Sequence, residues 1–429
     1  MSVYQELFKG IELPKMVHLH QEIDRVHIDN VEQAVKDELA RSGLLSRIKA
    51  GQRVALTAGS REIANYALIL KTIIGELKAI GASPFIIPAM GSHGGAIAEN
   101  QTALIAHFGI TEETMGVPIL SSMETVDVGV TPHGVPVYFD KNAAAADAII
   151  PVGRIKIHTC FHGKIESGLM KMLAVGCGKQ HGAAAMHAHG FHNMCQNVTE
   201  VARVNLEKLP IVFGFGILEN ACHQTRGVYA IPAEEMEQRE NEVLEISRAV
   251  APRIPYNKID MLFVDEIGKN ISGTGMDPNI TGRSSPLGKF EPNADRVAVF
   301  DLTDASDGSA YGVGNADIIT RRLFNKIIFE NTIPNGITNR DLKPLFLPAI
   351  MDTDKDAMLL AAATVPNLCP TSDLDAVWLH NTLCMEDIYI SEHLAKTGKL
   401  ISPAVIDWDD TYTFTFDEQG NVIRPKFLA

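Results

Sequence analysis

Histidine, the side chain best suited to moving protons near neutral pH, is concentrated in one short stretch of the chain. Six of the 15 histidines lie between residues 158 and 192: His158, His162, His181, His187, His189 and His192. Neutral imidazole is also the commonest metal ligand in proteins. The stretch therefore predicts an acid–base site or a metal site, with a hydrogen-bonded structural role as the alternative for any single histidine.

Lysines and glycines are mixed with these histidines. The lysines are Lys164, Lys171 and Lys179, and the glycines around them are Gly168, Gly176, Gly178 and Gly182. Glycine lets a backbone approach a phosphate or a flat ring closely. A lysine in that setting can contact the phosphate or bond to a carbonyl-type carbon of a cofactor, although it can also be simply solvated. No Gly-x-Gly-x-x-Gly or Walker sequence occurs at a strand-to-helix turn, so a dinucleotide site of the Rossmann sort gets little support.

Three glycine-containing loops each follow an apolar run that is typical of a buried strand. Residues 53–57 lead into Ala58-Gly-Ser-Arg61, residues 84–89 into Met90-Gly-Ser-His93, and residues 147–152 into Gly153-Arg-Ile-Lys-Ile-His158. Ligands bind outside the carboxyl ends of parallel strands, so we expect these loops to meet at one site presenting Arg61, His93 and His158. Two imidazoles and a guanidinium suit an anionic substrate, although each loop alone could merely start a helix.

The elements that must position these loops alternate between strand-like and helix-like patterns. Strands are expected at 53–57, 84–89, 147–152, 211–215, 261–264, 297–302 and 376–379, and helices at 31–42, 64–77, 96–108, 233–249 and 315–329. Asn30 and Gly43 are the expected caps of the first helix. This alternation predicts an α/β fold with a mostly parallel sheet covered on both faces. The proline-containing break Ala251-Pro-Arg-Ile-Pro-Tyr256 predicts domains over 1–255 and 256–429.

Composition limits the possible partners. The 429 residues are 46% hydrophobic and 21% charged, as in ordinary globular proteins. The formal net charge is −14, which argues against a nucleic-acid partner. No apolar run reaches the roughly 18–20 residues of a membrane span, and the first residues lack an apolar signal region, so we expect a cytoplasmic protein without a membrane partner. Six cysteines without a Cys-x-x-Cys pair favour neither a disulfide scaffold nor structural zinc.

The ordered motifs resemble one known family. Gly-Ser-Arg61, Gly-Ser-His93, the loop 153–158 and Ser167-Gly-Leu-Met-Lys171-Met-Leu-Ala-Val-Gly-Cys-Gly are similar to the lactate racemase family, the nickel-pincer-nucleotide enzymes. The resemblance implies a Rossmann-like, mostly parallel N-terminal domain and a smaller α/β C-terminal domain that closes the substrate site. It also implies the nickel-pincer nucleotide, a Ni(II) pyridinium bisthiocarboxylate mononucleotide, loaded by cofactor-biosynthesis proteins.

The resemblance assigns roles to individual positions. His93 and His158 correspond to the two catalytic acid–base histidines, Lys171 to the lysine that can be joined to the cofactor, His187 to the nickel ligand, and Arg61 to an arginine that holds the substrate carboxylate. Gly168 and Gly176, on either side of Lys171, are expected at the cofactor. Lys269 is the best candidate for the family's substrate-contacting lysine in the second domain.

The activity implied is a racemase or epimerase that inverts the hydroxyl-bearing carbon of a small-molecule 2-hydroxy acid. Hydride moves to the cofactor while a histidine takes the hydroxyl proton, because the α-proton of a 2-hydroxy carboxylate is a very weak acid. Lys164-Ile-Glu-Ser167 departs from the glycine-rich lactate racemase sequence, which favours another acid and leaves lysine attachment of the cofactor open. The polar residues 270–279 suggest a sugar acid such as an aldonate, or only a solvated turn. Two alternatives remain: a zinc-dependent hydrolase or lyase using the His/Cys cluster, and a non-catalytic nucleotide-binding relative.

Overall fold

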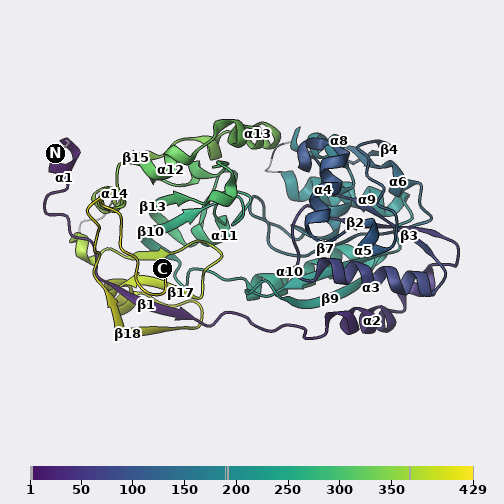
Figure 1. Cartoon of the computed structure of the whole chain (residues 1–429), viewed down its shortest axis with the longest axis horizontal. Helices are drawn as coiled ribbons and strands as arrows, with labels where there is room; N and C mark the ends of the chain where they lie inside the picture. Colours follow the sequence, from purple (N-terminus) through teal and green to yellow (C-terminus); the bar gives the residue numbers. More distant parts are fainter. Residues whose placement is uncertain (1–2, 189, 191–192, 367–368, 429) are drawn as a thin grey trace. The chain divides into compact units, whose positions relative to one another are not determined.

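The chain divides into two compact units, and each is described here by itself (Figure 1). The computed structural model describes residues 3–188, 190, 193–366 and 369–428. The N-terminal unit is Asp24–Ala251, and the C-terminal unit joins Met1–Ile23 to Pro252–Ala429. The sequence predicts a first domain over residues 1–255. In the structure, residues 1–23 instead belong with the second unit, because a strand in them pairs with strands near residues 390 and 405.

The N-terminal unit is built of short strands and nine helices within its described residues. Its strands are β2 (Arg53–Ala58), β3 (Ser83–Pro88), β4 (Thr125–Val130), β5 (Pro136–Asp140), β6 (Ala148–Ile150), β7 (Val152–Arg154), β8 (Phe213–Glu219) and β9 (Thr225–Pro232). Its helices are α2 (Val31–Ser42), α3 (Tyr66–Ala79), α4 (Ala98–His107), α5 (Glu112–Met115), α6 (Lys141–Ala144), α7 (Leu169–Lys171), α8 (Lys179–Ala188), α9 (Met194–Lys208) and α10 (Met236–Val250).

Strands β3, β2 and β6 form a parallel sheet whose two faces are both buried. Side chains alternate across a strand, so Val54 and Leu56 of β2 pack with residues of α2 and α3, while Ala55 packs into a second core with Leu169. This confirms the predicted parallel sheet covered on both faces. The carboxyl ends of parallel strands share one edge, so the loops after β2 and β3 leave the sheet side by side.

Pro151 separates β6 from β7, and the chain passes there from one sheet to a second, β7-β8-β9. The two sheets stay linked because the N–H of Val152 donates to the Thr57 hydroxyl oxygen across 2.9 Å. Strand β7 pairs with β8 in parallel and β8 with β9 in antiparallel. The loop after β7 therefore begins next to the end of β2.

The predicted caps of α2 are confirmed. The Asn30 side chain accepts a hydrogen bond from the N–H of Gln33, and Gly43 ends the helix at a φ of 65°, in the left-handed region that glycine adopts without strain. The predicted helix at 315–329 is wrong. Residues Ile318–Thr320 form the buried strand β14, since two β-branched isoleucines fit a sheet better than a helix, and Thr320 caps the short α12 that follows.

The C-terminal unit is organised around one large sheet. Its strands are β1 (Met16–Gln21), β10 (Lys258–Ile267), β11 (Arg283–Ser284), β12 (Gly288–Lys289), β13 (Asn293–Leu302), β14 (Ile318–Thr320), β15 (Ala349–Met351), β16 (Ala376–Leu379), β17 (Asp387–Ser391) and β18 (Ala404–Tyr412). Its helices are α1 (Val3–Leu7), α11 (Pro278–Thr281), α12 (Arg321–Lys326), α13 (Phe329–Asn339), α14 (Asp354–Thr364) and α15 (Glu392–Thr397).

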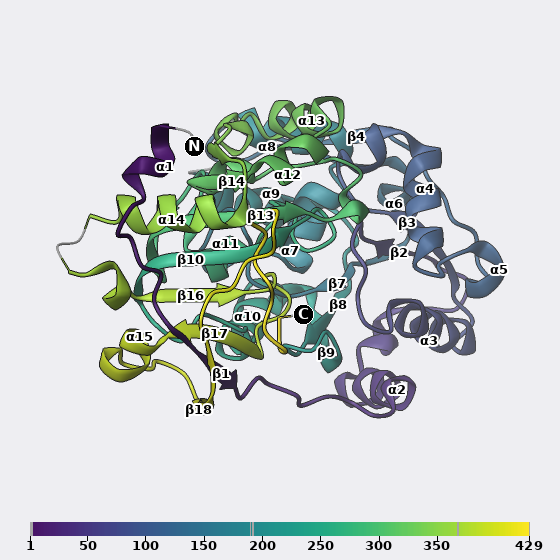
Figure 2. The same ribbon diagram turned by 60° about the vertical axis from the view of Figure 1, so that its left-hand side comes forward.

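The large sheet has eight strands in the order β15-β14-β13-β10-β16-β17-β1-β18. The first five run parallel, and the last three pair in antiparallel. Figure 2 shows the purple β1 beside the yellow β17 and β18. Because β1 pairs with both of these strands, the first residues of the chain belong to the C-terminal unit. Within the described residues, no helix has the length and apolar character needed to cross a membrane.

Candidate active site

The three predicted loops converge on one segment, which comprises α7 and the π-helical turn Met172–Gly176. A Cβ at Gly59, after β2, or at Gly153, in β7, would lie 3.2 Å from the terminal methyl carbon of Met172. After β3, the N–H of Gly91 donates to the carbonyl of Gly176 across 3.2 Å. A Cβ at Gly176 would come within 2.6 Å of the Ala89 carbonyl oxygen. Gly176 is thus required for close backbone packing between the turn and the loop after β3.

His158 lies beyond β7 in a closely defined environment. Its backbone N–H donates to Glu166 across 2.6 Å, and its Nδ1 accepts the N–H of Cys160 across 2.9 Å. Its ring stacks on Phe161 with the centroids 4.0 Å apart. Burial, followed by the positive charges of Lys171, Lys156, His162 and His187, holds the pKa of His158 well below 6.5. The ring is therefore neutral at pH 7.

The pKa of Lys171, the last residue of α7, is lower than that of an ordinary lysine. Burial is the main cause that lowers its pKa to about 8, and the charges of Lys156 and Arg61 lower it further, while Cys160 and Glu166 act in the opposite direction. Its ammonium lies 5.8 Å from the centroid of the Phe161 ring. At pH 7 to 8 a useful fraction of this amine is unprotonated and nucleophilic.

Arg61, in the loop after β2, lies close enough to Lys171 for its charge to lower the pKa of that lysine. Within the described part of the chain it forms no ion pair with a carboxylate, unlike Arg154, which pairs with Glu219. Although Arg61 is exposed as a whole residue, desolvation of its guanidinium and the charge of Arg154 lower its pKa. An arginine that no carboxylate of the described residues balances suits a carboxylate of a substrate.

The loop that carries His93 is held by backbone and amide contacts. Gly94 and Gly95 have φ values of 66° and 67°. The Gln101 side chain donates to the carbonyls of Gly91 and His93, at 3.0 and 2.9 Å. These contacts tie the loop to the Gly176 turn through Gly91. His93 is itself an exposed side chain, and its acid–base role stays a prediction.

The clustered histidines separate into groups. His187, in α8, and His162 lie near enough to His158 for their charges to lower its pKa. His181 instead hydrogen-bonds Thr125 through Nδ1 at 3.1 Å. His189 and His192 lie outside the described residues. In the described residues, no group of three or more His, Cys, Asp or Glu side chains is placed to hold a metal ion, so a metal here would have to draw on single donors such as His187.

Two predicted features have structural roles. Lys179 is fully buried and its Nζ lies 2.9 Å from the Asp140 carboxylate, an ion pair inside the core. Gly168 lies against Glu240, because a Cβ there would come within 2.3 Å of a Glu240 carboxyl oxygen. That buried carboxyl accepts the N–H of Met170 at the start of α7. The need for glycine at 168 is thus explained by packing, and its contact with a cofactor stays a prediction.

Glu166 organises the loop that contains His158 and was missed from the sequence. This fully buried carboxylate accepts the N–H groups of His158 and Gly163 and pairs with Arg248 of α10. Burial acts to raise the pKa of Glu166, but hydrogen bonds from His162, the His158 backbone and Arg248 leave it lowered. Glu166 lies in the Lys164-Ile-Glu-Ser167 departure from the family pattern, and that departure was the available signal.

Lys156 was also missed. Ile155 is fully buried, so alternation along an extended chain puts Arg154, Lys156 and His158 on the opposite face. The pattern Arg-Ile-Lys-Ile-His could have indicated this shared face from the sequence.

Lys269 lies in the C-terminal unit, after β10. Its ammonium donates to the Gly273 carbonyl and to the Asn335 side chain, both at 2.9 Å, and lies 5.1 Å from the Tyr311 ring centroid. Its role toward substrate stays a prediction.

The polar loop that suggested a sugar acid is hydrogen-bonded to its own unit. Thr303 donates to the Asn270 side chain at 2.6 Å, and Thr274 donates to the Met276 carbonyl at 3.0 Å. The Asn279 side chain donates to Asp277 at 2.9 Å. The polar side chains of this partly buried loop are thus engaged within their own unit, which weakens the reason for choosing a sugar acid.

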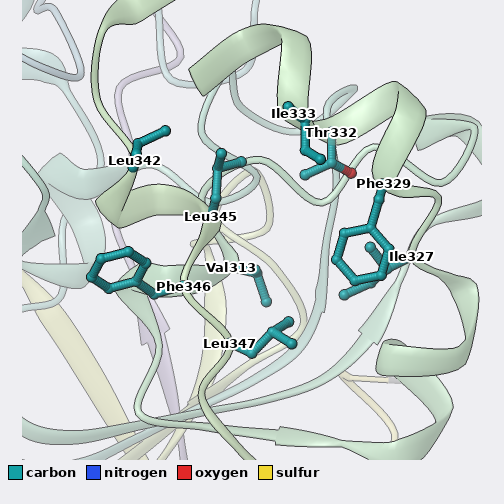
Figure 3. A pocket seen from close by; sticks show the side chains of 9 residues that line it. All are labelled: Val313, Ile327, Phe329, Thr332, Ile333, Leu342, Leu345, Phe346 and Leu347. Atoms are coloured by element: carbon teal, nitrogen blue, oxygen red, sulfur yellow. The ribbon is translucent and has the colours of Figure 1, made fainter. Parts of the chain in front are cut away.

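A partly open apolar pocket of about 320 Å³ lies in the C-terminal unit (Figure 3). It is lined by Val313, Ile327, Phe329, Thr332, Ile333, Leu342, Leu345, Phe346 and Leu347. The Thr332 hydroxyl is the only polar side-chain group in this lining, and it donates to the Ile328 carbonyl across 2.9 Å. The cavity offers no acid, base or metal ligand.

Comparison with known proteins finds one family profile that matches part of this chain. Residues 10–198 match the family profile of the lactate racemase N-terminal domain. This match confirms, over that part of the chain, the resemblance to the lactate racemase family seen in the sequence. Every predicted site residue except Lys269 falls inside the matched range.

Two solved structures are similar. The lactate racemase apoprotein of Thermoanaerobacterium thermosaccharolyticum is 15% identical over 70% of this chain and 71% of that chain, with a TM-score of 0.45. A Thermotoga maritima protein of known structure is 14% identical over 64% of this chain and 72% of that chain, with a TM-score of 0.50. The second likeness shows a shared fold, and the predicted α/β class is confirmed. No curated protein sequence matches the chain.

Proposed function

We propose that this chain is a racemase or epimerase that inverts the hydroxyl-bearing carbon of a 2-hydroxy acid with the nickel-pincer nucleotide as cofactor. The observation that carries the proposal is that Arg61, His158 and Lys171 lie close enough for their charges to interact, within a segment that matches the profile of the lactate racemase N-terminal domain. A cation for the carboxylate, an imidazole for proton transfer and a nucleophilic amine are the groups that this reaction needs.

The residues present fit the cofactor. Lys171 offers an amine whose pKa of about 8 allows covalent attachment, and His187 offers an imidazole within electrostatic reach of His158. Ni(II) binds nitrogen and soft donors, so the His187 imidazole would suit it as a protein ligand if the nucleotide supplied the others. When bound, the cofactor supplies a hydride acceptor for the substrate carbon.

The chain's own residues bind the acid and move its proton. Arg61 binds the carboxylate through two parallel N–H bonds, which fixes the orientation of the carbinol carbon. His93 and His158 exchange the hydroxyl proton, one for each enantiomer. At His158 the exchanging atom is Nε2, because Nδ1 accepts the N–H of Cys160. Uptake of a proton at Nε2 requires the ring proton on Nδ1, so the Cys160 hydrogen bond must open in that half of the reaction.

The test is expression with a cofactor-biosynthesis system, followed by native mass spectrometry and elemental analysis. We expect nickel with a mass increment equal to the nucleotide, and inversion of 2-hydroxy acids measured by chiral chromatography. His93→Ala and His158→Ala should each abolish inversion, and Lys171→Ala should remove covalent attachment. Stoichiometric zinc without nickel would favour the hydrolase or lyase. Nucleotide-dependent thermal stabilisation without turnover would favour the non-catalytic relative.

A further inference from the structure

We propose that Glu240 is a positioning residue for Lys171, because its carboxyl holds the first turn of the helix that carries this lysine. Lys171 enters here as the amine to which the cofactor attaches, so the proposal rests on the proposed function. Both residues lie in the N-terminal unit, where α10 packs against α7. Glu240 itself has no part in the chemistry described above.

The first turn of α7 cannot be capped by the residue that precedes it. The N–H groups at the start of a helix have no acceptor within the helix, and a side-chain oxygen of the preceding residue usually accepts one of them. In α7 that residue is Gly168, which has no side chain. Glu240 of α10 supplies the acceptor instead, because the N–H of Met170 donates to its Oε2 across 2.8 Å.

Gly168 and Glu240 are closely fitted to each other. A Cβ at residue 168 would lie 2.3 Å from Oε1 and 2.5 Å from the carboxyl carbon of Glu240, so a larger residue would displace this carboxyl. The φ of Gly168 is 177°, an extended value that any residue adopts. Glycine is therefore needed here because it lets the carboxyl reach the start of α7.

The Glu240 side chain is fully buried and has no ion-pair partner among the described residues. Burial raises its pKa to about 8, hydrogen bonds from the N–H groups of Met170 and Leu169 act to lower it, and the charge of Glu237 on the same helix raises it. At pH 7 the carboxyl is therefore mostly protonated, and it accepts the N–H of Met170 without leaving a full negative charge in the core.

Other charged groups near α10 have partners elsewhere. Glu237 pairs with Arg203 of α9 at 2.6 Å. The remaining titratable side chains on the elements packed against α10 are Lys171 of α7, Glu219 of β8, Arg226 and Tyr229 of β9, and Glu234 and Glu235 just before the helix. Among the described residues, Glu237 is the one whose charge shifts the pKa of Glu240.

Lys171 directly follows Met170, so the capped turn determines where its amine lies. The ammonium lies 5.8 Å from the centroid of the Phe161 ring, and burial lowers its pKa to about 8. Without the carboxyl, the first N–H groups of α7 would be buried without an acceptor, and the turn would have to open toward water. The amine would then be solvated, and its pKa would rise toward the ordinary 10.5.

Competitive labelling of the full-length protein with isotopically labelled acetic anhydride, read by peptide mass spectrometry over a range of pH, measures the pKa of Lys171 without cofactor. The lysine is partly exposed, so a small reagent reaches it. We expect Glu240→Leu to raise this pKa by at least about one unit. Glu240→Gln keeps an oxygen that accepts the N–H of Met170 and should leave the pKa within about 0.3 unit of the wild-type value. Glu242→Leu, at an exposed position of the same helix, is the matched control and should not change it.

Gly168→Ala removes the same hydrogen bond from the other side. Its Cβ would displace the carboxyl, so this variant should also raise the pKa of Lys171. Adding Gly168→Ala to Glu240→Leu should give no further rise, because the bond is already lost. Either single variant is sufficient for the test if the other does not fold.

Thermal melts of the wild type and Glu240→Gln test whether the carboxyl is neutral. Between pH 4.5 and about pH 8 native Glu240 keeps a proton that the unfolded chain has released, so wild-type stability falls as the pH rises through this range. The Tm of Glu240→Gln relative to the wild type should therefore increase by roughly 5 °C or more from pH 5 to pH 8. A constant difference would mean that the buried carboxyl is ionised, and would contradict the environment assigned to it.

An unchanged Lys171 pKa in folded Glu240→Leu or Gly168→Ala would overturn the positioning role, even if the variant were less stable. A shift in Glu240→Gln as large as that in Glu240→Leu would overturn it as well. Failure of the proposed function gives a different result, because the labelling needs neither cofactor nor turnover. A Lys171 pKa that depends on Glu240 in a protein that binds no nickel nucleotide would refute the cofactor and keep the positioning role. Inversion by a loaded protein whose Lys171 does not respond to Glu240 would refute the positioning role alone.

Discussion

The backbone N–H of Cys160 donates a hydrogen bond to Nδ1 of His158 across 2.9 Å. A neutral imidazole carries one proton, so this bond places it on Nε2. The ring then presents Nε2–H as a donor toward a substrate oxygen, which suits stabilisation of the 2-oxo form of the acid. The other tautomer, which can accept the hydroxyl proton, requires a local change at residues 158–160.

We therefore expect His158 to be neutral and protonated on Nε2 in the protein without substrate. Burial and four neighbouring cationic or imidazole groups hold its pKa well below 6.5, so the ring should remain neutral at pH 6.5 and gain its proton only at lower pH. Nitrogen-15 NMR of labelled histidine, with His158→Gln to assign the signal, measures both the tautomer and the titration. A ring that is mostly protonated at pH 6.5 would contradict the environment described.

Lys171→Met should stabilise the protein at pH 7 by about 1–3 kcal/mol. The native pKa of about 8 lies below the ordinary value of 10.5, so burial of the charged amine opposes folding below pH 8. Between pH 8 and pH 10.5 the unfolded chain binds a proton that the native protein has released, so wild-type stability rises with pH there. Thermal melts at pH 7 and pH 10 should show a larger gain at pH 7. An equal gain at both values would mean that the amine is not desolvated.

Glu166→Gln should destabilise the N-terminal unit by about 2–4 kcal/mol, because it leaves Arg248 without its buried partner. The carboxylate also accepts the N–H groups of His158 and Gly163, so the loop should loosen and its amides should exchange faster. Glu245→Gln is the matched control, since Glu245 is the exposed partner of Arg248 on the same helix. It should change stability by less than about 0.5 kcal/mol. Urea unfolding measures the stability of both variants. A similar loss of stability in the two would refute the role of Glu166.

Gly176→Ala should destabilise the protein by about 1–3 kcal/mol and reduce loading of the cofactor. Its Cβ would come within 2.6 Å of the Ala89 carbonyl oxygen, so the turn and the loop after β3 would have to separate. Gly75→Ala, in the exposed middle of α3, meets no atom within 4 Å and should instead stabilise by about 0.5–1 kcal/mol. Chemical denaturation of the pair gives the comparison. A neutral Gly176→Ala would show that the close approach is not needed.

The sequence was sufficient where local pattern decides structure. Asn30 and Gly43 cap α2 as expected, and buried runs at β2 and β3 end in the loops that meet near Gly176. The sequence was insufficient for strands whose pairing partners lie far away along the chain. Strand β1 reads Met-Val-His-Leu-His-Gln with little alternation in its burial, and its partners lie more than 360 residues away.

The candidate site shows the same limit. The positions of Arg61, His158 and Lys171 could be proposed from loop placement and family resemblance, but their mutual electrostatic effect depends on folding. The departure at residues 164–167 marked the segment that contains Glu166, but it did not show that this glutamate is buried. The partner of Glu166, Arg248, lies 82 residues further along the chain.

The position of β1 between β17 and β18 also constrains how the protein is made. Met16 pairs with Tyr412, so this pairing cannot form until residue 412 has been synthesised. At 5–20 residues per second this delay is roughly 20–80 s. The N-terminal unit can fold during that interval, whereas residues 16–21 remain an unpaired strand edge. The growing chain therefore needs protection at this edge until β17 and β18 complete the sheet that β1 joins.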